Sequence, residues 1–273
     1  MELYRAKVGF EFKGGLILVK KSICALMAIT FIAFGSVAFG ADDSWKKVED
    51  RGCLLVGFCA AYPPFESRNE KSGEFEGFDV DLGKALAEEM GVSVKFVDGE
   101  WQGLIGGLFK GDYDVLMTCM SKSEGRGKNV SFSDVYYELR DVIVVRADDD
   151  RFSSEEDLKG MVVGAQQGSG AMQVLDKLDG LKEKMYYNYN PEAFLDLKNS
   201  RIDAVIVGLA YAVERINEDP SYRVVAPVGD AAEIVAVMPK GSDDLTAQMN
   251  KALASLRSNG KWQALVDRWL SVD

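Results

Sequence analysis

The sequence predicts an α/β protein of two lobes, each a mainly parallel sheet flanked by helices, with two segments crossing between the lobes. From residue 53 onward, short apolar runs alternate with amphipathic stretches, the pattern of repeated strand–helix–strand units. This alternation occurs in two sets, separated by the acidic run at 148–150. The β-branched runs at 142–146 and 234–238 are the predicted crossings.

In the first set, the strand at 54–58 leads through Pro63 and Pro64 to a helix at 79–90, which Gly91 ends. Glycine is favoured just past a helix because it adopts the left-handed conformation without steric cost. The same alternation predicts strands at 93–97 and 115–117 and a helix at 104–109.

In the second set, a Gly-Ser-Gly turn at 168–170 separates the first strand from the first helix, and a later helix begins at Pro191. Proline suits a helix start because the N–H it lacks has no partner there. The predicted strands are 162–165, 185–187, 204–207 and 224–226, and the predicted helices are 171–178, 191–199 and 210–216. After the second crossing, a helix at 244–258 and a segment at 262–270 finish the chain.

The chain opens with a predicted targeting segment. Lys20 and Lys21 precede an apolar stretch at 23–39, and small residues at 38–41 offer a cleavage position. A polar sequence follows, so this is a secretory signal peptide of residues 1–40 rather than a membrane anchor. The residues before Val19 fit no signal-peptide plan, which favours a natural start near Val19. Without a cysteine at the cleavage site, lipid anchoring is not expected, and we predict a periplasmic protein.

Composition narrows the function. Without residues 1–40 the chain has 27 Lys and Arg against 41 Asp and Glu, a net charge of −14. An acidic surface argues against nucleic-acid or anionic-membrane binding. The chain has no histidine, which excludes histidine-based catalytic triads and histidine-ligated metals. Three cysteines remain, and Cys59 and Cys119 each end a predicted neighbouring strand. They either pair, hold a soft metal or simply line a cleft, and we favour the cleft.

The run from Met117 to Arg126 is the most informative part of the chain. A strand end is followed by Ser121 and, five residues on, by Arg126. A guanidinium is a planar donor matched to a carboxylate, and a hydroxyl adds a further donor. Ligands of open parallel sheets lie at the carboxyl ends of the strands, so this run predicts an anion clamp. An incidental surface loop is the alternative for the run taken alone.

Further motifs stand in a fixed order around this run. They are Ala-Tyr-Pro-Pro-Phe-Glu at 61–66, Gly-Phe-Asp-Val-Asp-Leu at 77–82, Trp-Gln-Gly-Leu-Ile at 101–105, Phe-Ser-Asp-Val-Tyr-Tyr at 132–137 and Arg-Ile-Asp-Ala-Val at 201–205. From about Trp45 to the end, the chain resembles the bacterial extracellular solute-binding proteins of family 3, the polar amino-acid receptors of ABC importers. The resemblance implies a periplasmic-binding-protein clamshell, with lobe 1 at 41–143 plus 232–273 and lobe 2 at 144–231.

The resemblance also implies the ligand contacts. Arg126 and Ser121 match the family's carboxylate clamp, Tyr62 and Trp101 match the side chains that enclose the ligand, and the turn at 167–170 matches a glycine-rich turn that completes the carboxylate site. The full expected ligand-binding set is Cys59, Tyr62, Trp101, Cys119, Met120, Ser121, Arg126, Gln166, Ser169, Gly170, Gly208 and Tyr211. We expect no catalytic residue, metal or cofactor.

Two departures from the family pattern bear on the ligand. The family's acid that accepts the ligand's α-ammonium is replaced here by Gly208, and a second polar position is Cys59. A buried ammonium without a charge partner is costly. Three explanations stay open: the ligand lacks an α-ammonium, another acid substitutes, or Tyr211 and water accept the bonds. Glu233, Glu138 and Glu100 are the candidate acids, and Gly208→Asp is expected to improve amino-acid binding if the lost acid sets selectivity.

The expected function is capture of an amino acid or related small carboxylate by hinge closure, as the periplasmic binding component of an ABC importer. The expected partner is an inner-membrane permease, and the expected state is a monomer. A cyclohexadienyl dehydratase-like enzyme is the alternative on the same fold, but its acid position holds Tyr211, a poor proton donor at neutral pH. Presenting ligand to a chemoreceptor is a further alternative.

Overall fold

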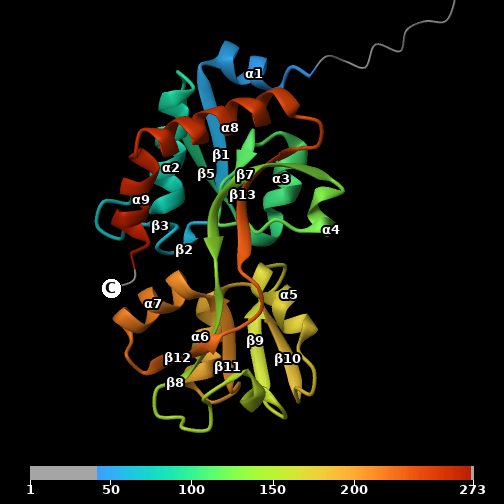
Figure 1. Ribbon diagram of the computed structural model, residues 1–273, viewed down its shortest axis with the longest axis vertical. Helices are drawn as coiled ribbons and strands as arrows, with labels where there is room; N and C mark the ends of the chain where they lie inside the picture. Colours follow the sequence, from blue (N-terminus) through green and yellow to red (C-terminus); the bar gives the residue numbers. More distant parts are fainter. Residues whose placement is uncertain (1–41, 272–273) are drawn as a thin grey trace, which may run out of the picture. The chain divides into compact units, whose positions relative to one another are not determined.

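The computed structural model describes residues 42–271. The predicted signal peptide of residues 1–40 and the predicted natural start near Val19 lie outside the described residues. Within 42–271, two sheets with helices around them form the two lobes (Figure 1). This is the predicted α/β architecture of two sheet-containing lobes.

The first sheet has the strand order β5-β1-β6-β13-β7. β1 is parallel to both β5 and β6, whereas β13 is antiparallel to β6 and β7. The strands are β1 (Cys53–Phe58), β5 (Ser93–Asp98), β6 (Val115–Leu116), β7 (Val130–Leu139) and β13 (Ala232–Pro239). A small antiparallel sheet lies beside it, formed by β2 (Ala61–Tyr62), β3 (Glu66–Arg68) and β4 (Phe75–Glu76).

Helices cover the first sheet (Figure 1). They are α1 (Ser44–Arg51), α2 (Phe78–Glu89), α3 (Leu104–Lys110), α8 (Asp243–Ser258) and α9 (Lys261–Trp269), with η1 (Trp101–Gly103) and α4 (Glu124–Gly127) in the connections. The apolar side chains of α2, including Phe78, Leu82 and Leu86, pack with Leu54 and Val56 of β1 in one core. Gly91 follows α2 with φ 75°, the left-handed conformation expected where a helix ends.

The second sheet has the order β10-β9-β11-β8-β12. β9 is parallel to β10 and β11, and β8 is antiparallel to β11 and β12. Its strands are β8 (Asp141–Arg146), β9 (Val162–Gln166), β10 (Glu183–Tyr187), β11 (Ala204–Gly208) and β12 (Tyr222–Pro227). The helices around it are η2 (Glu155–Leu158), α5 (Gly170–Lys177), α6 (Asn190–Lys198) and α7 (Leu209–Glu218).

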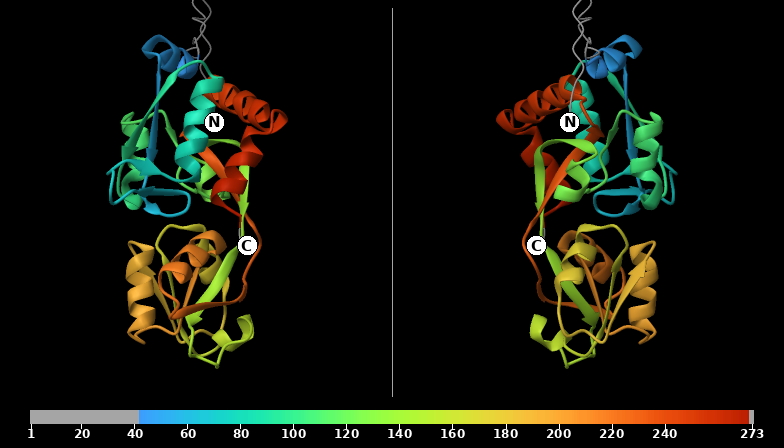
Figure 2. Two further views of the ribbon diagram at one scale, coloured as in Figure 1. Left: turned by 90° about the vertical axis from the view of Figure 1, so that its left-hand side faces the viewer. Right: turned by 90° about the vertical axis from the view of Figure 1, so that its right-hand side faces the viewer.

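The described chain passes between the sheets twice, between β7 and β8 and between β12 and β13. Figure 2 shows these two passages side by side at the junction of the lobes. The run at 142–146 was predicted to cross between lobes, but β8 is a buried strand of the second sheet. Likewise, β13 lies in the first sheet. The lobe bounds 41–143 plus 232–273 and 144–231 stay a prediction, and β8 begins three residues before the predicted change of lobe.

Candidate functional site

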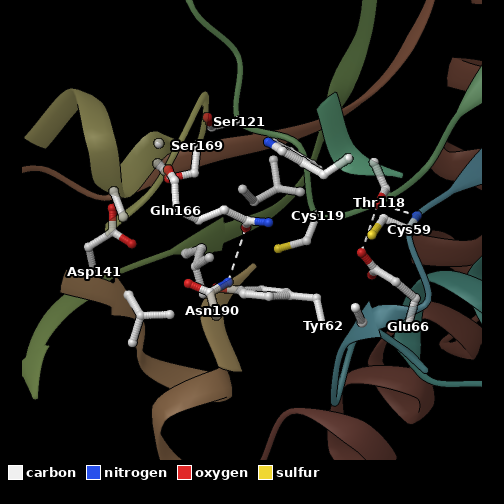
Figure 3. A pocket seen from close by; sticks show the side chains of 18 residues that line it. Cys59, Tyr62, Glu66, Thr118, Cys119, Ser121, Asp141, Gln166, Ser169 and Asn190 are labelled. Carbon is white, nitrogen blue, oxygen red and sulfur yellow. Dashed lines mark hydrogen bonds between the residues drawn. The ribbon is translucent and has the colours of Figure 1, made fainter. Parts of the chain in front are cut away.

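A cavity lies where the two lobes meet, and Figure 3 shows the side chains on its walls. Several wall segments follow the carboxyl ends of parallel strands, where open α/β sheets place their ligands. The first lobe contributes the connections after β1 and β6, and the second contributes the ends of β9 and β11 with the start of β8. The lining residues are Cys59, Ala61, Tyr62, Glu66, Trp101, Thr118, Cys119, Ser121, Leu139, Asp141, Gln166, Ser169, Gly170, Ala171, Asn190, Val207, Ala232 and Ile234.

Ser121 and Arg126 lie together, as the sequence predicted. Ser123 caps α4 by accepting a hydrogen bond from the Arg126 N–H at 3.3 Å. This short helix turns the arginine side chain back toward Ser121. The guanidinium Nη1 donates to the Ser121 backbone oxygen and, at 3.0 Å, to Ser121 Oγ. Ser121 lines the cavity, whereas Arg126 lies behind it and is not among the lining residues.

Arg126 also joins the two lobes. Its Nη2 donates to the backbone oxygen of Gly168 at 2.5 Å, and Trp101 Nε1 donates to the backbone oxygen of Gln167 at 3.1 Å. Burial lowers the pKa of Arg126 to about 10, so it stays charged at neutral pH. A guanidinium has five N–H donors. Three of them donate to the Ser121 backbone oxygen, to Ser121 Oγ and to the Gly168 backbone oxygen. The other two have no protein acceptor within residues 42–271.

Tyr62 is part of an aromatic stack between the lobes. Its ring lies on that of Tyr211, with centroids 4.7 Å apart and planes at 11°. Tyr62 lines the cavity, but Tyr211 is buried beneath it and is not a lining residue. Trp101 forms another part of the wall, with the Arg126 Cζ 5.9 Å from its ring centroid. Offset stacking adds to the apolar area that such rings bury.

The predicted turn of the second lobe lies in the wall. Ser169 caps α5: its Oγ accepts from the Met172 N–H at 3.0 Å and donates to the Gln166 backbone oxygen at 2.7 Å. The Gln166 side chain is held by Asn190, whose Nδ2 donates to Gln166 Oε1 at 3.1 Å. Gly170 lies so close to the first lobe that an added Cβ would be 3.0 Å from Ser121 Oγ.

The cysteines and Met120 are placed in different ways. Cys59 and Cys119 line the cavity as free thiols, and burial raises the pKa of Cys59 to about 12. No cluster of potential metal ligands occurs in the described part of the chain. Met120 was expected in the ligand site, but its side chain is buried with Leu116 and Val235 in the first-lobe core. Only its backbone oxygen, which accepts from Val235 N–H at 3.1 Å, faces a neighbouring strand.

Gly208 ends β11 and precedes α7. It is not a lining residue, although it lies directly behind the wall. A Cβ added here would be 2.6 Å from Leu139 Cδ2 and 2.6 Å from the Tyr62 hydroxyl. Side chains essentially never approach so closely, so any side chain at this position would have to displace Leu139 or Tyr62. The expectation that Gly208→Asp improves binding is therefore in conflict with the packing.

Sequence reasoning missed the carboxyl group of Asp141. This residue is the first of β8, it is 4% exposed, and it lines the cavity. Burial raises its pKa to about 7. The three acids suggested as substitutes at the cleft do not line the cavity: Glu233, Glu138 and Glu100 are all exposed, and Glu233 pairs with Lys122 at 3.2 Å. The signal for Asp141 was its place before a β-branched run, but this run was interpreted as a crossing.

Sequence reasoning also missed two buried acids of the first-lobe wall: Glu66 lines the cavity, and Asp79 contacts the lining residue Cys119. Glu66 Oε1 accepts from Thr118 Oγ1 at 2.8 Å, and Asp79 Oδ2 accepts from the Cys119 N–H at 2.5 Å and from the Tyr136 hydroxyl at 3.0 Å. Burial raises the pKa of both carboxyls, and the neighbouring Asp79 raises that of Glu66 further. Figure 3 shows Glu66 and Asp141 on opposite sides of the cavity.

Comparisons with known proteins agree with this two-lobed site. Residues 54–272 match the sequence model of the bacterial extracellular solute-binding proteins, family 3. The chain is 34% identical over 263 residues to the L-arginine-binding protein of Pseudomonas aeruginosa, covering 93% of this chain and 98% of that protein. It is 28% identical over 260 residues to the L-cystine-binding protein TcyJ of Escherichia coli, covering 94% and 97%.

A solved structure shares the fold. A mutant of ArgBP from T. maritima superposes with a TM-score of 0.77 at 36% identity, covering 84% of this chain and 100% of that one. A clamshell of two α/β lobes with a cavity at their junction defines a ligand-binding protein. This chain belongs to family 3 of the bacterial extracellular solute-binding proteins.

The relatives named above are binding proteins, and the chain is a solute-binding protein rather than an enzyme. The geometry at Tyr211 agrees, because this residue occupies the position of the alternative enzyme's acid but is buried behind Tyr62. Burial also raises the pKa of the Tyr211 hydroxyl above its ordinary value, which makes proton donation less favourable. In residues 42–271, no helix has both the length and the apolar character needed to span a bilayer.

Proposed function

We propose that this protein captures an amino acid in the periplasm by closing its two lobes, and that it delivers the ligand to an inner-membrane ABC permease. The proposal includes removal of the signal peptide of residues 1–40, no lipid anchor, and a monomeric binding protein. The observation that carries it is the cavity at the junction of the lobes, because its walls come from both of them. A ligand that contacts both lobes shifts the open–closed equilibrium by the contacts it adds in the closed form.

Arg126 is the proposed centre of carboxylate recognition. Its guanidinium is already oriented by Ser121, and two of its N–H donors have no protein acceptor in the described chain. Oriented donors lose little entropy when a ligand binds. Because Arg126 also donates to Gly168 of the other lobe, a carboxylate bound here would lie at the junction of the two lobes. Ser169 and Gly170 are the proposed contacts from the second lobe.

The proposed ligand is an amino acid, with arginine, glutamine and cystine the first to test. The relatives' names support this class, since they include an arginine-binding and a cystine-binding protein. The wall supports it as well, because an aromatic face at Tyr62 and Trp101 encloses both apolar stems and cationic groups. The net charge of −14 after removal of residues 1–40 also favours attraction of cationic solutes.

The test is titration calorimetry with these amino acids and the Arg126→Ala variant. We expect the variant to bind about 2–4 kcal/mol more weakly, because a buried carboxylate would lose its charge partner. Lys128→Ala is the matched control, since it removes an exposed cation from the same loop. Equal affinity of wild type and Arg126→Ala would contradict the clamp.

Closure of the two lobes can be measured separately from ligand affinity. Small-angle scattering of the wild type should report a smaller radius of gyration once the ligand is added, because the lobes approach each other. Arg126→Ala should show this contraction only at higher ligand concentration. A radius that stays constant at saturating ligand would contradict capture by closure.

A further inference from the structure

Asp141 is a buried acid that opens into the cavity without a side-chain partner. It begins β8 and is 4% exposed. Its carboxylate accepts no hydrogen bond from residues 42–271, whereas its backbone oxygen accepts from the Val228 N–H at 3.0 Å. Figure 3 shows the side chain among those that surround the cavity. The structure therefore leaves a carboxylate facing the space where a ligand would bind.

The other three buried acids of the described chain each accept at least one hydrogen bond on the carboxylate, although Glu66 Oε2 and Asp79 Oδ1 have no partner. Asp79 accepts from Cys119 and Tyr136, and Asp149 forms ion pairs with Arg146 and Arg151 at 2.7 Å each. A buried carboxylate without such partners destabilises the folded protein. Asp141 is buried without such a partner and lines the cavity. We therefore expect the ligand to supply the missing partner. A partner that also balances the charge of a carboxylate is a cation with hydrogen-bond donors, such as an ammonium or guanidinium group.

The position of Asp141 connects it with Gly208. The two residues face each other across the antiparallel pair of β8 and β11. Directly opposed residues of such a pair have their side chains on the same face of the sheet, with Cβ atoms about 5 Å apart. A carboxylate on residue 141 therefore lies within one side-chain length of where an acid at position 208 would lie. Tyr62 occupies the space beside Gly208, so an acid at 208 would have to displace Tyr62 or Leu139, whereas the acid at 141 coexists with both.

We propose that Asp141 accepts the ammonium group of the ligand and makes this site specific for amino acids over carboxylates without nitrogen. The inference rests on the proposed function, and it chooses among three explanations for Gly208. The explanation chosen is that another acid, Asp141, takes the place of the acid that Gly208 replaces. The acids considered from the sequence are exposed, and Tyr211 is separated from the cavity by Tyr62. A nitrogen-free ligand would leave the Asp141 carboxylate buried without a partner.

The test compares Asp141→Asn with wild type, using L-arginine, L-glutamine and L-cystine as probes. Asparagine keeps the size and removes the charge. We expect Asp141→Asn to weaken binding of the tightest probe by roughly 10–100-fold, the usual range for a lost hydrogen bond to a charged group. Glu233→Gln is the matched control. It removes an exposed acid near the cleft, and it should change affinity less than about 2-fold.

A second arm removes the α-ammonium from the probe instead of the charge from the protein. 5-Guanidinopentanoate is arginine without its α-ammonium. It should bind wild type weakly, and Asp141→Asn should discriminate much less between it and L-arginine. Thermal unfolding of each variant shows whether it is folded, and Asp141→Asn should unfold at no lower temperature than wild type at pH 8, because it removes a buried charge.

The outcomes separate the inference from the proposed function. Equal binding of an amino acid by wild type and Asp141→Asn overturns the inference and leaves amino-acid capture intact. Tighter binding of 5-guanidinopentanoate than of L-arginine by wild type also overturns it. If no amino acid or carboxylate binds the folded wild type, the proposed function fails and the inference fails with it. A selective loss in Asp141→Asn, with Glu233→Gln unchanged, supports both.

Discussion

Gly208 lies where β11 meets α7, with Leu139 and Tyr62 packed against its backbone. The absence of a side chain at residue 208 has two consequences. It removes the acid that the family resemblance led us to expect, and it lets Tyr62 of the first lobe approach the second lobe and stack on Tyr211 at 4.7 Å. A side chain at 208 would have to displace Tyr62 or Leu139, and over-packing of this kind typically costs about 1–3 kcal/mol.

Gly208→Ala and Gly208→Asp should therefore both weaken ligand binding, by roughly 5–100-fold, because the cost falls mainly on the closed form. Calorimetry with the tightest amino acid checks this. Gly106→Ala is the matched control, since an added Cβ there meets no atom within 4 Å. Tighter amino-acid binding by Gly208→Asp would contradict the packing argument and restore the expectation drawn from the sequence.

The charge placed at Asp141 could not be located from the sequence for a related reason. Asp141 and Gly208 are far apart along the chain, and they become neighbours only through the antiparallel pairing of β8 with β11. Ser121 and Arg126 were easier to place together, because they are five residues apart in one loop. Local spacing predicts contacts within a loop, whereas contacts between strands depend on sheet order.

At the scale of elements, β3, α2 and the loop after β6 meet at the cavity wall through hydrogen bonds among Glu66, Asp79, Thr118 and Cys119. Asp79 is the main acceptor, with the Cys119 N–H and the Tyr136 hydroxyl as donors. Glu66 has one oxygen bonded to Thr118 and the other buried without a partner. Two buried carboxylates this close together would repel each other if both were ionised. Burial raises the pKa of both groups, which disfavours their ionised forms.

Asp79→Ala should reduce the free energy of unfolding by about 2–4 kcal/mol, because it leaves two buried donors without an acceptor. Glu66→Gln should cost less than about 1 kcal/mol at pH 7, since burial and the neighbouring Asp79 raise the pKa of the Glu66 carboxyl and so disfavour its charged form. Urea unfolding monitored by tryptophan fluorescence measures both. If Glu66→Gln were as destabilising as Asp79→Ala, Glu66 would have to be charged in the folded protein.

The strands and helices themselves were largely predictable. The helix predicted at 79–90 is α2 at Phe78–Glu89, and the strand predicted at 54–58 is β1 at Cys53–Phe58. The interpretation of 142–146 as a crossing was wrong, because β8 is buried between β11 and β12. A short β-branched run reads alike as an extended connection or a central strand, and only the pairing of neighbours decides between them.

At the scale of the whole molecule, the buried acid Asp141 lowers the stability of the unliganded protein. Asp141 has a folded pKa of about 7 against an ordinary value of 3.8. Below pH 4 the carboxyl is protonated in both the folded and unfolded states. Between pH 4 and 7 the unfolded state loses this proton first, so it binds fewer protons than the folded state and the free energy of unfolding falls. Cys119 and Tyr62 are titratable groups that interact electrostatically with Asp141, and burial raises the pKa of each above its ordinary alkaline value, so neither is expected to ionise in this range.

Without ligand, Asp141→Asn should therefore be more stable than wild type above pH 7, by at most about 4 kcal/mol. The two proteins should converge near pH 4. Unfolding free energies from pH 4 to 8 measure the difference, which isolates Asp141 because the Glu66–Asp79 pair is common to both proteins. A constant difference across this range would mean that Asp141 is ionised throughout. Improved stability with lost binding is the trade-off typical of a functional residue.

The sequence by itself determined the two α/β lobes, the solute-binding family and the pairing of Ser121 with Arg126, because these depend on local periodicity, motif order and short spacing. Only the tertiary structure decided which strands lie side by side. The pairing of β8 with β11 places Asp141 in the cavity wall opposite Gly208. Packing of the first lobe buries Met120 in its core, and the meeting of the lobes allows Arg126 to bond with Gly168. The physical reason is that burial and charge compensation are properties of neighbours in space, and the neighbours across this cavity come from segments that are distant in the chain.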